Sequence, residues 1–205
     1  MKKILIFILI LTLPIVIILT NFRLIIFNQH YYAKQFSEHK VYSKIPEADM
    51  IITNIIAYFK NKDKELNVKV FTENELSHMK DVKQLIHKVL IFYYVLLILD
   101  LLIIYIILKN DLTNAVPVLL FSGLIILLFS ISLYFVRNLF PVFFIKFHEI
   151  FFPQGNWIFP ESSKLVTLFP ESFFYNTVFI IFFRSFIIGV IFILIAILLS
   201  LSRKK

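Results

Sequence analysis

The stretch VLIFYYVLLILDLLIIYIIL, residues 89–108, contains a single charged side chain, Asp100. A helix rises about 1.5 Å per residue, so about 20 apolar residues span the hydrocarbon core of a bilayer. Neither glycine nor proline interrupts the stretch. It therefore predicts a transmembrane helix.

Similar apolar segments occur at residues 4–27, 115–136 and 178–201, and 60% of the chain is hydrophobic. A soluble domain is only about 45–50% apolar, so we expect an all-α membrane protein with four transmembrane helices in one membrane domain, residues 1–205. The first segment follows Lys2 and Lys3, as a signal peptide would. Its apolar run is too long and no small-residue cleavage site follows, so we interpret it as an uncleaved anchor.

Basic residues next to the expected spans predict the orientation. Lys2 and Lys3, Lys109 and the C-terminal residues 203–205 all lie on one side of a four-span protein. Positive flanking residues favour the cytoplasmic side, so we expect both termini there and a multi-pass protein of the cell membrane. Residues 28–88 then form a small extracellular cap, and residues 137–177 form a second extracellular segment.

Three features are expected within the cap. A capping box at Thr72 and Glu75 predicts the start of a helix that continues without proline or glycine to Leu108. Residues 68–71 have the pattern of a short strand. An amphipathic helix is also expected, with one apolar face formed by Met50, Ile51, Ile52, Ile55, Ile56 and Phe59.

The segment 137–177 is rich in phenylalanine and contains the only tryptophan, Trp157. We expect short turns at the membrane interface, where aromatic side chains enter lipid and polar groups stay hydrated. Four prolines argue against a long helix in this segment: Pro141, Pro153, Pro160 and Pro170.

Two histidines are candidates for proton transfer. His78 lies at the start of the long helix and His148 in the Phe-rich segment, both expected at the outer face. Two neutral imidazoles there could act as base and acid on one substrate, with Asp81 or Glu149 fixing their tautomers. The alternative is that they are ordinary interfacial side chains, as most histidines at a membrane interface are. The chain has three further histidines, His30, His39 and His87.

Two charged residues within the spans have open roles. Asp100 is either functional or hydrogen-bonded, in its protonated form, to a serine or threonine of another helix. Arg184, near the outer end of the last span, either anchors the helix or orients a polar lipid group.

Several functions are excluded by what the chain lacks. It has no cysteine, and its three glycines are too few for a Gly-rich phosphate loop. Metal-ligand spacings such as HExxH are missing, and no catalytic elbow surrounds Ser162, Ser163 or Ser172. The net charge is +8, but no basic stripe interleaved with aromatics indicates nucleic-acid binding. We expect no metal and no nucleic-acid partner.

Two motifs resemble the lipoprotein intramolecular transacylase (Lit) family. One is Thr72-Glu73-x-Glu75-x-x-His78-Met79-x-Asp81-Val82-Lys83, followed by a span. The other is Phe147-His148-x-x-Phe151-Phe152, with Trp157, Phe159 and Leu168-Phe169-Pro170-Glu171-x-Phe173-Phe174 before the last span.

The resemblance implies a four-helix membrane protein with an extracellular cap and an active site facing the extracellular side. It implies transfer of the sn-2 acyl chain of a diacylglyceryl-cysteine lipoprotein to the α-amine of that cysteine, giving the lyso form, with no cofactor. The partners are then the lipoprotein substrate and membrane lipid. The resemblance implies catalysis by His78 and His148, with Trp157 and Glu171 in the matching motifs as supporting residues.

Ester-to-amide transfer needs a base for the amine and an acid for the leaving oxygen, and we expect His148 and His78 in these roles. Asp81, Glu149 and Arg184 complete the expected supporting set. Two other functions stay open: an accessory membrane protein whose cap binds a partner, and a transporter. Few polar groups lie in the spans, which argues against transport.

Overall fold

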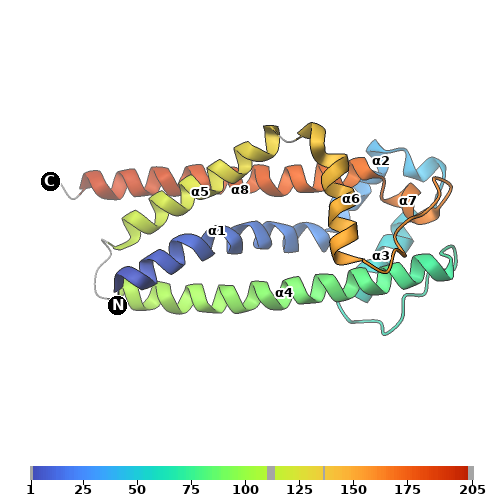
Figure 1. The fold of residues 1–205 in the computed structure, drawn as a ribbon, viewed down its shortest axis with the longest axis horizontal. Coiled ribbons are helices and arrows are strands. Elements are labelled where there is room, and N and C mark those ends of the chain that lie inside the picture. The colour runs from blue at the N-terminus through green and yellow to red at the C-terminus, as the bar shows by residue number, and fades with distance from the viewer. Residues whose placement is uncertain (1, 110–113, 136, 203–205) are drawn as a thin grey trace. The chain divides into compact units, whose positions relative to one another are not determined.

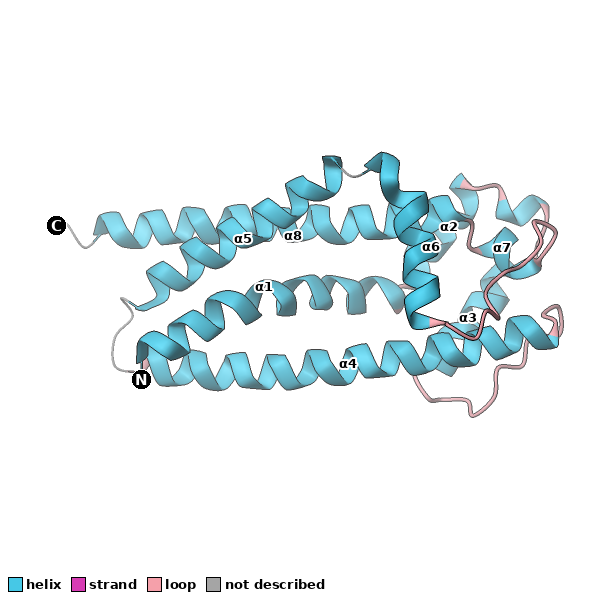
Figure 2. Ribbon diagram, viewed as in Figure 1, coloured by secondary structure: helices cyan, strands magenta, loops and turns pink. Residues whose placement is uncertain are grey.

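The computed structural model describes residues 2–109, 114–135 and 137–202, and these ranges contain helices but no strand (Figures 1 and 2). The prediction of an all-α protein is confirmed. The helices are α1 Lys2–Ile26, α2 Gln29–Glu38, α3 Ala48–Phe59, α4 Glu73–Leu108, α5 Ala115–Phe135, α6 Phe140–Phe151, α7 Lys164–Leu168 and α8 Glu171–Ser202, with 3-10 turns η1 Val41–Ser43 and η3 Arg137–Leu139.

Helices α1, α4, α5 and α8 are long and apolar enough to cross a membrane. They confirm the four expected spans, although residue 136 lies outside the described residues. Helix α8 begins at Glu171, earlier than the expected residue 178. The expected loop over 171–177 is therefore wrong, because no proline follows Pro170 and an acidic residue in the first turn favours a helix start.

The contacts of the chain divide it into two compact units. The first comprises residues 1–23, 90–137 and 179–205, and the second comprises residues 24–89 and 138–178. The unit boundaries fall within α1, α4 and α8, each of which is an unbroken helix (Figure 1).

The first unit is a bundle of apolar helices with few polar contacts. Its core includes Leu9 of α1, Ile103 and Ile107 of α4, and Val118 of α5. Asp100 is 2% exposed, and Thr12 Oγ1 donates a hydrogen bond to its Oδ1 at 2.5 Å. Asp100 is thus hydrogen-bonded to a threonine of another helix.

Helices α5 and α8 approach each other closely at two glycines. A Cβ atom on Gly123 would lie 2.8 Å from the backbone oxygen of Gly189, and one on Gly189 would lie 3.2 Å from that of Gly123. Because no larger side chain fits between these backbones, the two glycines permit the contact.

The second unit has its own core, whose centre includes Phe36, Ile45, Ile52, Ile55 and Leu168, each at most 1% exposed. The core thus combines side chains from both extramembrane segments predicted from sequence.

Two local predictions in this unit are wrong. Met50 is 61% exposed, because it lies two residues from Ile52 and so on the opposite side of α3. The other five residues of the expected apolar face are buried. Residues 68–71 form a turn rather than a strand, with Phe71 N–H donating to the Val68 carbonyl at 3.0 Å.

Helix α6 was not expected in the Phe-rich segment. Pro141 is compatible with it because it lies in the first turn, where its missing N–H costs no helical hydrogen bond. Phe143, Phe147 and Ile150 on one face are exposed, whereas His148 faces the interior of the unit and is buried. The helix thus separates an exposed apolar face from the face that carries the candidate histidine.

Candidate active site

His78 of α4 and His148 of α6 come together in the second unit. Their ring centroids lie 6.2 Å apart, and their planes are inclined by only 27°. The residues are 7% and 8% exposed, respectively. The structure therefore brings together the two histidines that the sequence singled out from segments 70 residues apart.

Aromatic side chains surround this pair. The ring of Phe152 lies 4.8 Å from that of His78, and Phe159 contacts the same imidazole at 5.6 Å. On His148, the neighbours are Phe144 at 4.3 Å and Trp157 at 4.9 Å. Such surroundings exclude water and favour the uncharged form of both imidazoles.

The tautomer of His148 follows from one backbone contact. Its Nδ1 lies 2.7 Å from the carbonyl oxygen of Phe144. A carbonyl can only accept, so Nδ1 carries the hydrogen and the neutral ring has its lone pair on Nε2. Glu149 was expected to contribute to this orientation, but its carboxylate contacts Lys146 at 2.6 Å, and both side chains are exposed. The backbone therefore performs the task assigned to Glu149.

His78 differs from His148 in its hydrogen bonding. Its Nδ1 is buried and has no hydrogen-bond partner. Burial and the neighbouring His148 lower the pKa of His78 to about 4, opposed in part by Asn156 and Asp81. Burial also lowers the pKa of His148, opposed by the hydrogen bond to the Phe144 carbonyl. Both rings are consequently neutral at pH 7.

Asp81 lies one helical turn after His78 on α4. Its Oδ2 accepts hydrogen bonds from the side-chain amides of Asn156 at 2.7 Å and Gln154 at 2.8 Å. Asp81 thereby binds the segment that follows α6. Its role in fixing a histidine tautomer stays a prediction.

Glu75, one turn before His78, was predicted from sequence to form a capping box with Thr72 and belongs to the first of the two Lit-like motifs. That box is present: Thr72 N–H donates to Glu75 Oε2 at 2.7 Å, and Thr72 Oγ1 accepts from Glu75 N–H. The carboxylate is also 2% exposed and accepts from Ser163 Oγ at 2.5 Å and Leu165 N–H at 3.0 Å. These two partners are distant in sequence, so no local pattern could have indicated them.

Hydrogen bonding keeps Glu75 ionised. Burial by itself would raise the pKa of Glu75, but the hydrogen bonds from Ser163, Thr72 and Leu165 outweigh it, and the pKa lies below its usual value. The carboxylate is therefore an anion, and its negative charge is stabilised by hydrogen-bond donors and by the positive end of the α4 dipole.

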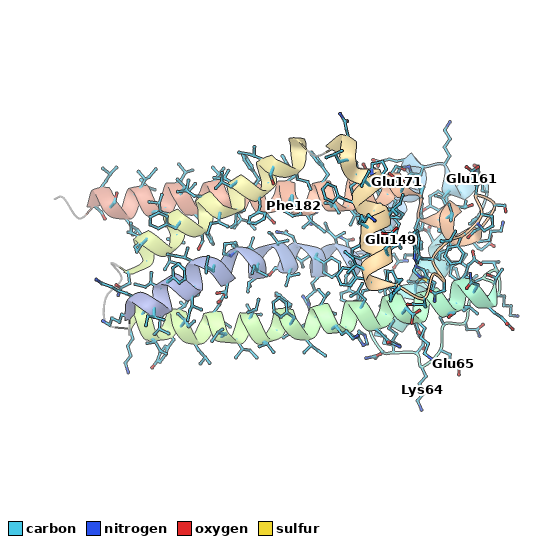
Figure 3. The ribbon with its side chains drawn as sticks, in the orientation of Figure 1. Lys64, Glu65, Glu149, Glu161, Glu171 and Phe182 are labelled. Carbon is cyan, nitrogen blue, oxygen red and sulfur yellow. The ribbon has the colours of Figure 1, made fainter. Side chains whose placement is uncertain are left out.

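Two predicted supporting residues remain, Glu171 and Arg184. Glu171 is exposed in the first turn of α8 (Figure 3), and Arg184 belongs to the first unit. Their supporting roles stay predictions. His87 contacts the Phe59 carbonyl at 2.8 Å, which ties α4 to the end of α3. Among the described residues, no three His, Asp or Glu side chains gather as a metal site requires.

Comparisons with known proteins agree with this architecture. A match of 29% identity to an uncharacterised protein of Aquifex aeolicus (strain VF5) covers 60% of this chain and 55% of the relative's length. The solved structure of the membrane-integral lipoprotein intramolecular transacylase Lit from Bacillus cereus is 17% identical, with a TM-score of 0.83 over 100% of this chain and 99% of that one.

A second Bacillus cereus Lit structure, in which a histidine is replaced by arginine, has a TM-score of 0.79 at 15% identity and covers 100% of this chain and 94% of that one. At these identities the similarity establishes the fold, that of a multi-pass membrane protein. The family model described as lipoprotein intramolecular transacylase Lit matches residues 7–174. The chain therefore belongs to the lipoprotein intramolecular transacylase family.

Proposed function

We propose that this protein moves the sn-2 acyl chain of a diacylglyceryl-cysteine lipoprotein to the α-amine of the same cysteine. The observation that carries the proposal is the buried, neutral pair of His78 and His148, in a chain of the Lit family. Two such imidazoles suit an acyl transfer in which one proton is removed from the attacking amine and one proton is delivered to the departing glyceryl oxygen.

His148 acts as the base. Because its Nδ1 hydrogen is held by the Phe144 carbonyl, the lone pair on Nε2 accepts the proton from the substrate amine as nitrogen attacks the ester carbonyl. The C–N bond forms and the bond between the carbonyl carbon and the glyceryl oxygen breaks. An α-amine with a pKa of about 8 supplies enough of its neutral form near pH 7 for this attack.

His78 is the proton donor to the departing glyceryl oxygen. The proton gained by His148 then restores His78, so the net transfer is of one acyl group and one proton within the substrate. Because donor and acceptor belong to one molecule, the protein mainly holds the reacting groups in an attack geometry, which supplies several kcal/mol of the barrier reduction. No cofactor takes part in these steps.

The surroundings of the pair suit a lipid substrate. Phe144, Phe152 and Phe159, together with Trp157, provide apolar contact for acyl chains next to the imidazoles. In the orientation predicted from the flanking positive charges, this unit faces the extracellular side, where a lipidated protein N-terminus is accessible.

The first prediction concerns the two histidines. His78→Ala and His148→Ala should each lower acyl transfer by about a hundredfold or more, because general acid and base catalysis contributes that much. Mass spectrometry of the N-terminal lipopeptide of a co-expressed reporter lipoprotein measures the N-acyl, monoacylglyceryl product.

The exposed histidine of α2 provides a matched control for this experiment. His30→Ala should leave the product level unchanged. Full activity of both His78 and His148 variants would contradict the mechanism. An unmodified diacylglyceryl peptide with the unaltered protein present in the membrane would instead support the non-enzymatic, partner-binding alternative.

A further inference from the structure

Residues 154–165, which we term the strap, are bound to one face of α4 at two points. Near its start, Gln154 and Asn156 donate to Asp81. At its end, Ser163 and Leu165 donate to Glu75. Residues three apart lie on the same side of a helix, so His78 lies between the two attachment points.

The strap carries one aromatic ring that contacts each imidazole. Trp157 packs on His148 with a centroid separation of 4.9 Å, and Phe159 packs on His78 at 5.6 Å. Both rings belong to the short stretch between the two attachments. The position of these aromatic groups therefore depends on the two carboxylates of α4.

The two attachments differ in burial. The Glu75 carboxylate is 2% exposed and receives donors from two segments, including the N-terminal turn of α7. The bond from Gln154 to Asp81 is at the surface. Hydrogen bonds to a buried anion are worth more than exposed ones, so Glu75 makes the stronger attachment.

Two nucleophiles compete for the acyl carbonyl in the proposed reaction. Attack by the substrate amine gives the N-acyl lyso product. Attack by water, with the same base and the same leaving oxygen, gives a free fatty acid and a lyso lipoprotein with a free amine. Since the histidines can assist either nucleophile, the exclusion of water decides between the two products.

We propose that Glu75 is a positioning residue that, together with Asp81, holds the strap closed over His78 and His148 and so makes the protein a transferase rather than a hydrolase. This inference rests on the proposed function for its chemical consequence. The attachment itself can be tested without it.

Glu75→Gln tests the proposal by product ratio. One carboxylate oxygen accepts from Thr72 and the other from Ser163 and Leu165, so a glutamine, with one oxygen and one NH2 group, turns its NH2 toward a backbone N–H in either orientation and weakens the attachment of the strap. The reporter assay in water enriched in 18O measures both outcomes, because hydrolysis places the label in the released fatty acid. We expect the hydrolysed fraction to rise about tenfold, the worth of one lost hydrogen bond to a charged group.

Glu73→Gln is the matched control, since Glu73 lies in the same first turn of α4 but is exposed. It should keep the original product ratio. A Glu75→Gln protein that loses transfer and hydrolysis in equal proportion would overturn the proposal, because general structural damage lowers both products.

A second measurement is independent of catalysis. Trp157 is the only tryptophan, so intrinsic fluorescence reports on the strap alone. Quenching of Trp157 by acrylamide should increase in Glu75→Gln and stay unchanged in Glu73→Gln. If the unaltered protein gives neither product, the proposed function fails. Separately, an unchanged accessibility of Trp157 in Glu75→Gln would show that Glu75 does not hold the strap, and would overturn this proposal.

Asp81→Ala keeps the test available if Glu75→Gln does not reach the membrane, because it removes the oxygen that accepts from Gln154 and Asn156 at an attachment that is exposed or only partly buried. This variant should also raise the hydrolysed fraction and the quenching of Trp157, by less than Glu75→Gln. An unchanged ratio and an unchanged quenching in Asp81→Ala would overturn the proposal.

Discussion

At the scale of residues, the tautomer of His148 is set by a backbone carbonyl, and the pKa of His78 is set by burial and by a neighbour that is distant in sequence. His148 obtains its tautomer from the Phe144 carbonyl, which any residue at position 144 would offer. His78 obtains its low pKa from burial and from His148, and its Nδ1 is left without a partner. The identity of the residues was readable from the sequence, but these environments were not.

Trp157 reports the protonation of His148, because the two rings are in contact at 4.9 Å. A protonated imidazole quenches indole fluorescence, so acidification should reduce the emission. Since burial lowers the pKa of His148, we expect the midpoint below the unperturbed value of about 6.5. Fluorescence titration of the purified protein in detergent measures it.

The His148→Ala variant is the control for this titration and should lose the transition. A midpoint at or above about 6.5 would contradict the burial of His148.

At the scale of elements, composition predicted the long helices well and the short ones less well. A continuous apolar run requires a membrane helix whatever packs against it, so α1, α4 and α5 follow from sequence. The start of α8 and the whole of α6 depend on local capping, proline position and burial of one face. The pattern of apolar residues in one sequence does not separate these contributions. The prediction of a strand at residues 68–71 was wrong for the same reason.

The contact between α5 and α8 depends on Gly123. Gly123→Ala places a Cβ atom 2.8 Å from the Gly189 backbone oxygen and from Ile193 Cγ1, so the helices must separate. We expect a loss of about 1–3 kcal/mol in the free energy of unfolding, as for other overpacked sites. Thermal denaturation in detergent gives the comparison.

Ser132→Ala is the matched control on α5, because Ser132 is exposed and its hydroxyl bonds only within its own helix, to Phe129. It should unfold like the unaltered protein. If Gly123→Ala did the same, the close approach of α5 and α8 would not hold.

At the scale of the whole molecule, the buried histidines link stability to pH. The pKa of His78 is about 4 in the folded protein and about 6.5 in the unfolded chain. Between these values the unfolded chain binds more protons, so the stabilising contribution is present above about pH 6.5 and is lost as pH falls toward 4. His148, whose pKa is also lowered, acts in the same direction.

We therefore expect the unfolding temperature to fall between pH 7 and pH 5, and to fall less steeply in His78→Leu, which cannot bind the proton. The contribution of His78 amounts to as much as roughly 3 kcal/mol across its titration range. Thermal scans at several pH values measure the slope. Equal slopes for His78→Leu and the unaltered protein would refute this linkage, and His30→Ala should keep the original slope.

The sequence by itself determined that the chain crosses a membrane four times, because apolar length and backbone hydrogen bonding leave no other solution in lipid. It also indicated His78 and His148 through their motifs. Only the tertiary structure decided that these rings meet, that Phe144 sets a tautomer, and that Glu75 and Asp81 bind the strap. The Phe144 contact spans one turn of α6, whereas the others join residues far apart in sequence. The energies of all these contacts come from burial and hydrogen bonding that exist only once the chain has folded.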